Sequence, residues 1–138
     1  MRFTIYGDGG SRGNPGPAGS GAIIRNESGE TVATVSEFLG VTTNNVAEYT
    51  AVLRGLETLA GMLEGKAKDA EVHVRMDSML VIKQMSGEWK IKHPNMKPLA
   101  ARVYELVQLF GSVTFEHVYR EDNKDADRLA NEAMDKGR

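Results

Sequence analysis

The chain has 138 residues, enough for one domain with a substantial hydrophobic core, and we expect a single domain over residues 1–138. Its 41% hydrophobic and 26% charged residues are typical of a globular protein, and no window is apolar enough to span a membrane. The net charge of −2 argues against nucleic-acid binding through bulk charge alone, and the absence of cysteine excludes disulfides, thiolate metal sites and cysteine nucleophiles. Because no signal-like segment precedes the first strand pattern, we expect a cytoplasmic protein. We also expect the protein to be a monomer.

The N-terminal part of the chain predicts three antiparallel strands. Residues 2–8 are rich in β-formers and alternate in character, which predicts a strand. Residues 9–19 contain too many glycines and prolines for the interior of a helix or strand, so we expect a loop there. Residues 21–25 and 31–39 predict a β-hairpin around a turn at 26–30.

The rest of the chain alternates between helical and strand patterns. A helix opens after Thr42, where Asn45 and Glu48 form a capping-box pattern, and apolar residues at helical spacing run from Tyr49 to Leu63. The later elements are, in chain order, a polar linker at 66–70, a strand at 71–76, a short helix at 78–85, a loop at 86–98, a helix at about 97–110 ended by Gly111, a strand at 112–118, a polar loop at 119–124 and a helix at 125–136. This order predicts an α/β fold, with a five-stranded mixed sheet of three antiparallel and two parallel strands and helices on both faces.

Four carboxylates lie where strand patterns end or helices begin: Asp8, Glu48, Asp77 and Asp127. Taken singly, Asp8 could start a turn and Asp77 could be an N-cap. Glu48 could be only a capping-box partner, and Asp127 only a favourable charge at a helix N-terminus. A buried carboxylate is costly unless it is paired or binds a metal, so the set of four predicts a site for divalent cations. Oxygen ligands suit Mg²⁺, and two Mg²⁺ ions about 4 Å apart would activate water and stabilise the leaving oxygen of a phosphodiester, with Asp8 as the bridging ligand.

Two other groups of residues suggest binding of sugars and phosphates. The glycine-rich segment offers backbone groups beside Asp8, and the neighbouring polar side chains could hydrogen-bond ribose or phosphate: Asn14, Thr43, Asn44 and Asn45. Turn and cap chemistry is the alternative, and it explains Asn45 well. The second group surrounds Trp89 with basic residues, namely Lys83, Lys90, Lys92 and Lys97. This stretch suits a phosphate backbone and a sugar or base face, or it is a solvated loop with one core tryptophan.

Four motifs in this order resemble type 1 ribonuclease H and cover nearly the whole chain. They are Asp8-Gly-Gly-Ser-x-Gly-Asn-Pro-Gly-Pro, Thr43-Asn-Asn-x-Ala-Glu48, Met76-Asp-Ser and Asn123-Lys-Asp-Ala-Asp127-x-Leu-Ala-Asn. The resemblance implies the ribonuclease H-like fold and an endonuclease that cuts the RNA strand of RNA–DNA hybrids by a two-metal-ion mechanism. It further implies Mg²⁺, with Mn²⁺ as a substitute, and products with 3′-hydroxyl and 5′-phosphate ends. Whether double-stranded RNA is also cut is left open.

The resemblance also assigns roles to individual residues. Asp8, Glu48, Asp77 and Asp127 resemble the four metal-binding carboxylates of the family. Residues resembling those that face the RNA strand are Gly9, Gly10, Ser11, Asn14 and Asn45. Thr43 resembles a residue that holds a DNA-strand phosphate, and Trp89 an aromatic contact near the DNA strand. We count Asn44, Ser78 and Lys90 among the substrate-binding residues as well.

Two departures from the family pattern affect these expectations. Many members carry a histidine in the loop before the last aspartate, whereas this loop reads Tyr119-Arg-Glu-Asp-Asn, as in a histidine-lacking subgroup. Arg120 would take that place; its guanidinium stays protonated, so it could bind or release phosphate but not act as a general base. The basic segment after Met85 is also short, which predicts weak hybrid affinity with a modest salt dependence.

Two alternative functions remain at this stage. The first is a non-catalytic module that binds hybrids, against which the four intact carboxylates argue. The second is another metal-dependent phosphoryl-transfer enzyme, such as a DNA nuclease or an integrase-type domain. The glycine-rich segment and the two adjacent asparagines, both suited to ribose, argue against that second alternative.

Overall fold

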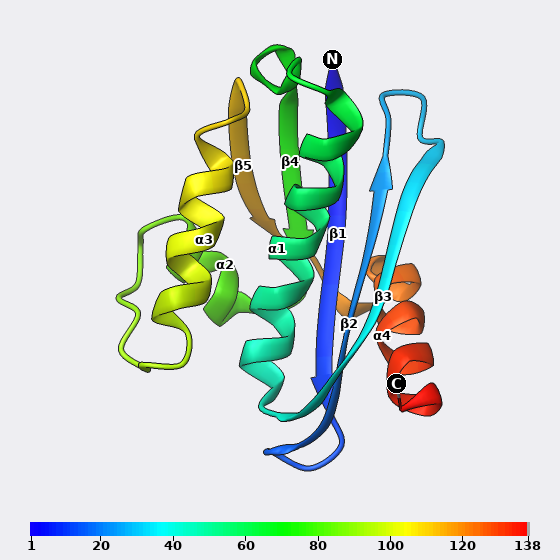
Figure 1. Ribbon diagram of the computed structural model, residues 1–138, viewed down its shortest axis with the longest axis vertical. Helices are drawn as coiled ribbons and strands as arrows, with labels where there is room; N and C mark the ends of the chain where they lie inside the picture. Colours follow the sequence, from blue (N-terminus) through cyan, green and yellow to red (C-terminus); the bar gives the residue numbers. More distant parts are fainter. Residues whose placement is uncertain (138) are drawn as a thin grey trace.

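The computed structural model describes residues 1–137, and its elements follow the predicted order of strands and helices (Figure 1). The strands and α-helices are β1 (Arg2–Ser11), β2 (Gly16–Arg25), β3 (Thr31–Thr42), α1 (Asn44–Leu63), β4 (Glu71–Met76), α2 (Met79–Met85), α3 (Lys97–Val107), β5 (Ser112–His117) and α4 (Lys124–Lys136). Two short 3-10 helices, Ala67–Asp69 and Arg120–Asp122, lie in segments where polar linkers were predicted. Within the described residues, no helix combines the length and apolar character that a membrane span requires.

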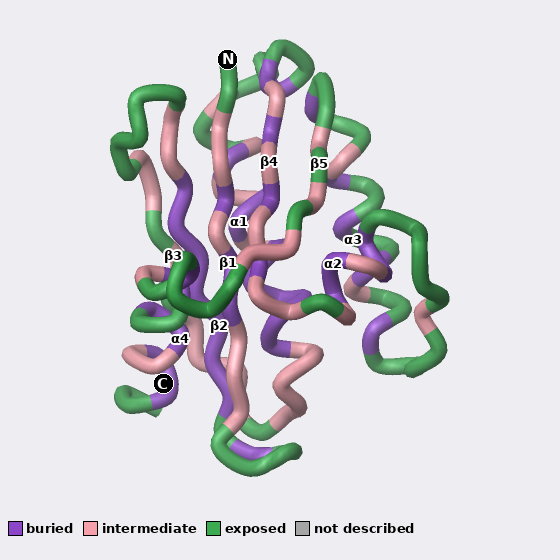
Figure 2. Tube along the Cα trace, turned by 180° about the vertical axis from the view of Figure 1, so that it is seen from behind, coloured by how far each residue is buried: buried purple, intermediate pink, exposed green. Residues whose placement is uncertain are grey.

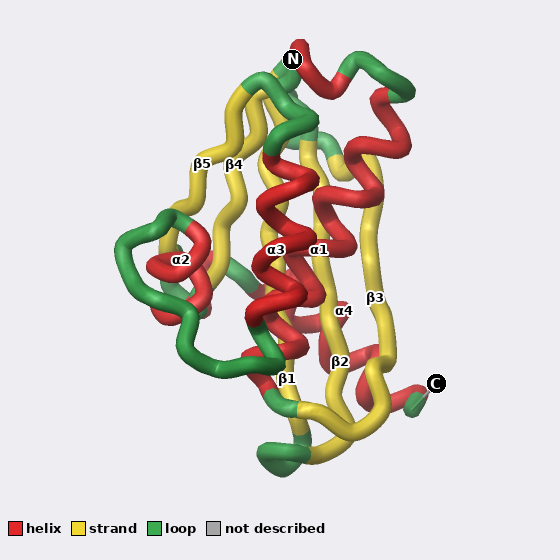
Figure 3. The backbone as a smooth tube through the Cα atoms, turned by 60° about the vertical axis from the view of Figure 1, so that its left-hand side comes forward, coloured by secondary structure: helices red, strands yellow, loops and turns green. Residues whose placement is uncertain are grey.

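The five strands form one mixed sheet in the order β3-β2-β1-β4-β5. Strand β1 is central, pairing antiparallel with β2 and parallel with β4, and β5 continues the parallel half of the sheet. Helices α1 and α3 lie side by side on one face, and α4 covers β2 on the other (Figures 1 and 3). The predicted fold class is therefore confirmed, including the three antiparallel strands, the two parallel strands and the helices on both faces.

The hydrophobic core lies between the sheet and the α1–α3 layer. Ile5 and Val74, from β1 and β4, are fully buried there against Val52 and Leu56 of α1. Strand β2 is buried over almost its whole length because helices cover both of its faces, as Figure 2 shows. The two central strands, β1 and β2, are thereby rigid supports for anything that projects from them.

The expectation of a loop over residues 9–19 is wrong for most of that segment. Strand β1 continues to Ser11 and β2 begins at Gly16, so only residues 12–15 lie outside the strands. Close packing against α4 accounts for Gly19, where a Cβ atom would overlap the carbonyl oxygen of Ala130. The same holds for Gly21 just beyond the segment, where a Cβ atom would overlap the carbonyl oxygen of Ala126 and the amide nitrogen of Ala130. Glycine in a strand commonly marks such a close backbone approach.

The boundaries of two helices also differ from expectation. Helix α1 begins at Asn44, and its N-cap is Thr43, whose Oγ1 accepts a hydrogen bond from the backbone nitrogen of Val46 at 3.3 Å. The predicted capping box of Asn45 and Glu48 is therefore wrong, and Glu48 is free for another role. Helix α3 ends at Val107, before Gly111, whose amide instead bonds the carbonyl of Ala70 at 3.0 Å at the start of the parallel strands.

The close contact of α4 with β2 makes Gly21→Ala a test of the packing. Because the added methyl group meets backbone atoms that cannot rotate away, we expect the free energy of unfolding to fall by about 3 kcal/mol. Gly61→Ala is the matched control: Gly61 lies within α1 with nothing within 4 Å of the added Cβ. That change should raise the free energy of unfolding by about 0.5–1 kcal/mol. Denaturant titration measures both, and equal stabilities of Gly21→Ala and the parent would contradict this packing.

Candidate active site

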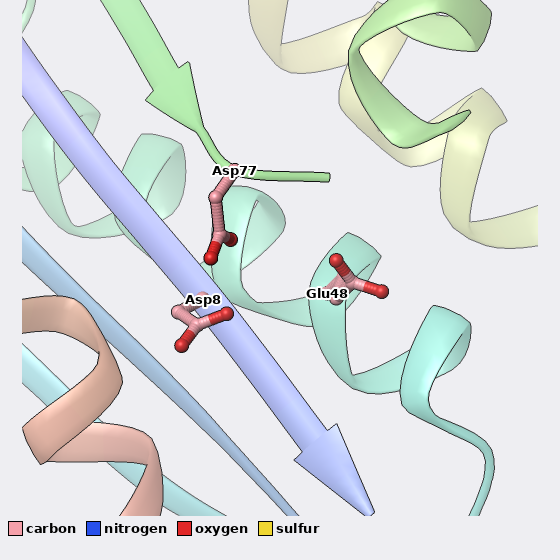
Figure 4. Close-up of side chains that lie close together, drawn as sticks. All are labelled: Asp8, Glu48 and Asp77. Atoms are coloured by element: carbon pink, nitrogen blue, oxygen red, sulfur yellow. The ribbon is translucent and has the colours of Figure 1, made fainter. Parts of the chain in front are cut away.

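Three of the predicted carboxylates converge where β1, β4 and α1 meet. Asp8 projects from β1, Asp77 follows the last residue of β4, and Glu48 lies in the second turn of α1 (Figure 4). One oxygen from each carboxylate lies within 4.8 Å of one from each of the others. The parallel register of β1 and β4 explains why Asp8 and Asp77 meet. Gly7 pairs with Met76, so the two aspartates that follow them are brought side by side.

The backbone around Glu48 is held against β1 and β2. A Cβ atom on Gly9 would overlap the backbone of Ala47 and Glu48, so only glycine lets α1 approach β1 this closely. The fully buried Ser20 of β2 donates a hydrogen bond from Oγ to the carbonyl of Ala47 at 2.6 Å. These contacts place the first turns of α1 over the sheet and direct Glu48 toward Asp8 and Asp77.

The electrostatics of this cluster are unfavourable without a cation. Asp8 and Glu48 are each only 8% exposed. Burial, followed by the charges of Asp77, Asp127 and Glu48 and a hydrogen bond with Asp127, raises the pKa of Asp8 to about 8. Burial and the charge of Asp77 raise the pKa of Glu48 to about 7, although a hydrogen bond with Ser78 opposes the change. Three converging carboxylates that lack compensating positive charge fit a site for a divalent cation, and their oxygens would be its ligands.

Arg120 forms an ion pair with Asp77, one of these three carboxylates. Its Nε lies 3.7 Å from Oδ2 of Asp77, at the long end of the range for an ion pair, and its side chain is 87% exposed. Within residues 1–137 no other ion pair involves Asp8, Glu48 or Asp77. An exposed pair of this length contributes little to stability, so Arg120 is available for another partner.

Asp127 lies at the rim of the same site and not among the three converging carboxylates. It is exposed, in the first turn of α4, and it acts on Asp8 through a hydrogen bond and its charge. Asp8, Asp77, Arg120 and Asp127 line one cavity of about 280 Å³. The structure therefore brings the fourth carboxylate to the site, while its role as a metal ligand remains a prediction.

The cavity also tests the predicted substrate-binding residues. Gly9, Gly10 and Ser11 line it as expected. Four further lining residues were not predicted: Arg12, Ala130, Asn131 and Met134. The sequence contained a signal for Asn131, because it follows Asp127 by one helical turn and so lies on the same face of the helix. Arg12 adjoins the glycines, but no sequence pattern indicates that it belongs to the site.

The polar residues around the start of α1 lie together but have structural contacts of their own. Oδ1 of Asn14 accepts a hydrogen bond from the backbone nitrogen of Asn44 at 3.1 Å, and Oγ of Ser11 donates to the carbonyl of Thr42 at 2.8 Å. With Thr43 acting as the N-cap, the alternative of turn and cap chemistry accounts for these contacts. Substrate binding by them, and by Asn45, remains a prediction.

Ser78 lies beside the carboxylates through its hydrogen bond with Glu48, whereas Trp89 and Lys90 lie outside the cavity. Ser78 is the N-cap of α2, with Oγ accepting from the nitrogen of Val81 at 3.3 Å, so the interpretation of Asp77 as an N-cap is wrong. Trp89 is 48% exposed and lines a separate hollow of about 600 Å³ with Lys90 and Lys92, so it is not a core tryptophan.

Sequence reasoning gave no role to Asn123, which the structure places inside the site. Its side chain is 1% exposed, and Nδ2 donates to the carbonyl of Gly7 at 2.9 Å and, at 3.4 Å, to Oδ1 of Asp77. Asn123 is the N-cap residue of α4, yet its side chain makes no cap bond because it points inward. It thus ties β1, Asp77 and α4 together. Its position four residues before Asp127 was the available signal.

Comparisons with known proteins agree with this geometry. A family model described as "Reverse transcriptase-like" matches residues 7–133. A bifunctional protein of Mycobacterium tuberculosis is 46% identical over 136 residues, which cover 98% of this chain and 36% of that protein. Ribonuclease HI of Halobacterium salinarum is 40% identical over 134 residues, which cover 97% of this chain and 65% of that protein. The chain thus spans about a third of the length of the mycobacterial relative.

A solved structure is similar over its whole length. The crystal structure of LC11-RNase H1 in complex with an RNA/DNA hybrid has a TM-score of 0.92 and 47% sequence identity. The similarity covers 97% of this chain and 97% of that one.

The raised pKa values predict how the stability of the metal-free protein depends on pH. The folded-state pKa values of Asp8 and Glu48, about 8 and about 7, exceed the ordinary values of 3.8 and 4.5. The folded protein therefore binds more protons than the unfolded chain between these limits, so stability falls as pH rises from about 4 to about 8. Thermal unfolding in a chelator should give a melting temperature several degrees lower at about pH 8 than at about pH 5.

Asp8→Asn is the control for this pH dependence, because the amide cannot ionise. Its melting temperature should vary less between the same two pH values, and Mg²⁺ should raise it less than that of the parent. A metal-free parent protein whose stability rises or stays constant over this range would contradict the assignment of Asp8 and Glu48 as uncompensated groups.

Proposed function

The chain belongs to the type 1 ribonuclease H family, and from this premise we propose that it hydrolyses the RNA strand of RNA–DNA hybrids. The observation that carries the proposal is the convergence of the buried Asp8 and Glu48 with the partly buried Asp77, short of compensating charge, beside a cavity open to solvent. Such a cluster suits divalent cations and phosphodiester chemistry. The similarity to an RNase H1 that was crystallised with a hybrid supports the choice of substrate.

The residues fit a site for two Mg²⁺ ions, with Mn²⁺ as a substitute. Asp8, Glu48, Asp77 and Asp127 would supply the ligands, with Asp8 held on the central strand between the other groups. When bound, the ions supply an activated water and stabilise the leaving oxygen, which gives 3′-hydroxyl and 5′-phosphate ends. The role of the protein is to hold four oxygen donors on rigid elements, with Asn123 orienting Asp77 through its amide.

The substrate is held by groups around the cavity. Backbone groups of Gly9, Gly10 and Ser11 face the ribose 2′-hydroxyls of the RNA strand, which is how RNA is distinguished from DNA. Arg120, exposed at the rim, binds the phosphate near the cut through its guanidinium, which donates hydrogen bonds and has no acceptor atom. Trp89 and Lys90 contact the DNA strand from their separate hollow. We further assign this activity to a single domain, residues 1–138, acting as a monomer.

Cleavage of an end-labelled hybrid in Mg²⁺, Mn²⁺ or a chelator tests the proposal, with Asp77→Asn as the decisive variant. Loss of one ligand charge should reduce kcat by more than about 100-fold. This exceeds the usual effect of removing a residue that only hydrogen-bonds a metal ligand. Asp69→Asn is the matched control, because Asp69 is an exposed carboxylate before β4, at the strand end opposite Asp77. Its activity should equal that of the parent protein.

Matched duplex DNA and double-stranded RNA serve as substrate controls. Cutting of duplex DNA at a similar rate would favour the alternative phosphoryl-transfer enzyme. Tight binding to the hybrid without metal-dependent cutting would replace the proposal by the non-catalytic module. Full activity of Asp77→Asn at saturating Mg²⁺ would show that the metal site is elsewhere.

Arg120→Ala tests the role of the guanidinium. Losing one charge-assisted hydrogen bond to phosphate should lower kcat/KM by about tenfold, far less than Asp77→Asn. Arg120→Lys retains the charge and should recover part of the loss. A defect in Arg120→Ala as severe as that of Asp77→Asn would mean that Arg120 acts directly in the chemical step.

A further inference from the structure

A pair of buried polar side chains connects the carboxylate site with the segment that carries Trp89 and Lys90. Tyr49, fully buried in α1, donates a hydrogen bond from its hydroxyl to Oε1 of Gln84 at 2.7 Å. Gln84, 4% exposed in α2, donates from Nε2 to the backbone carbonyl of Lys90 at 3.2 Å. Tyr49 directly follows Glu48 in the chain, so two hydrogen bonds lead from a proposed metal ligand to a proposed substrate contact.

We propose that Tyr49 and Gln84 are positioning residues that set the Trp89–Lys90 segment relative to the carboxylate site and thereby determine how tightly the hybrid is held. This inference rests on the proposed function, in which the hybrid is held at both places. Neither residue touches the substrate; both act through the backbone of Lys90.

The segment after α2 needs such support because it has little structure of its own. Residues 86–96 contain no helix or strand. The backbone nitrogens of Glu88 and Trp89 both bond the carbonyl of Lys83, at 2.9 and 3.0 Å, which folds the segment back onto the end of α2. These bonds are local and do not relate the segment to α1, where Glu48 lies.

The Tyr49–Gln84 hydrogen bond supplies that relation. A hydrogen bond between Glu48 and Ser78 also links α1 to the start of α2. Among the side-chain hydrogen bonds of residues 1–137, however, only the Tyr49–Gln84 bond joins α1 to the residue that bonds Lys90. Both ends of the Gln84 amide are used, so rotation of the amide would break both bonds and place a donor against the tyrosine hydroxyl. Gln84 also lines the hollow that contains Trp89 and Lys90, so its position shapes the proposed DNA-strand site.

Stability alone does not account for a polar pair in this core. Burying a hydroxyl and an amide is costly, and replacing both partners by apolar groups of similar shape is commonly neutral or stabilising. A fully satisfied buried network instead specifies one arrangement of its parts. Removing both polar groups therefore separates a positioning role from a structural one.

The variants for this test are Tyr49→Phe, Gln84→Met and the double variant. Tyr49→Phe alone leaves Oε1 of Gln84 without a partner in the core and should lower the melting temperature. The double variant should regain the melting temperature of the parent, yet its Kd and KM for a hybrid should both be about tenfold higher, a change that corresponds to about 1.4 kcal/mol. At saturating hybrid and Mg²⁺, kcat and the Mg²⁺ concentration for half-maximal activity should change less than twofold.

Thr50→Val is the matched control. Thr50 is the next residue of α1, and its hydroxyl donates to the carbonyl of Val46 at 2.7 Å, within the helix itself. This substitution also removes one largely buried hydroxyl with little change of shape, but it leaves Gln84 and Lys90 untouched. Its Kd and KM for the hybrid should equal those of the parent protein.

Trp89 gives a readout that does not depend on any activity, because it is the only tryptophan in the chain. Acrylamide quenching of its fluorescence in the free protein should increase in Gln84→Met and in the double variant, and should not change in Thr50→Val.

Hybrid binding in a chelator gives Kd without cleavage. A parent protein that binds but does not cut the hybrid would therefore refute only the proposed function.

Two results would overturn the inference itself. One is a double variant with parental Kd, KM and quenching, which would show that the pair is only a packing element. The other is a set of Kd values that follows the melting temperatures, with the double variant fully recovered. Absence of hybrid binding by the parent protein would refute both the inference and the proposed function.

Discussion

Asp8, Glu48 and Asp77 are held within 4.8 Å of one another and largely away from water, so their mutual repulsion must be balanced by protons or by a cation. The pKa values of Asp8 and Glu48, raised to about 8 and about 7, express the first solution, and divalent cations are the second. Folding has to supply the free energy that keeps these charges together. Much of the surrounding structure can be understood as the means of doing so.

The central strands and the helix packed on them carry the cluster. Asp8 and Asp77 project from adjacent parallel strands in the middle of the sheet, and Glu48 projects from the helix packed on them. Glycines at the crossing points let α1 and α4 approach the strands with their backbones, and buried hydrogen bonds from Ser20 and Asn123 complete these contacts. The same contacts explain why the segment after Asp8 is strand and not loop. Its glycines serve close packing as well as any contact with a ribose.

How far the sequence was informative depends on whether a feature is local. The strand end before Asp77 could be predicted, because the hydrophobic pattern stops there. The strand end predicted at Asp8 was wrong, since β1 continues through its glycines to Ser11. The capping box of Asn45 and Glu48 was a wrong prediction, because the sequence offers several adjacent residues that could cap the helix and the structure has Thr43 in that role. Arg12 and Asn123 were given no role, since their contacts in the site join elements distant in sequence and the spacing of Asn123 from Asp127 alone does not show that its side chain points inward.

The Tyr49–Gln84 pair belongs to the same class of non-local features. By spacing alone, Tyr49 is one more residue on the buried face of an amphipathic helix, and Gln84 is a polar residue in a short helix. Their hydrogen bond is apparent only once α1 and α2 are packed together. It has a consequence for a chain with so short a basic segment. Because few basic side chains are available to contact the phosphates, binding must depend on where each of them is placed more than on their number. A basic side chain that is displaced loses its phosphate contact, and few others can replace it. A buried polar pair that sets the position of Lys90 and Trp89 is one way in which a chain of net charge −2 can hold a polyanion without a large basic surface.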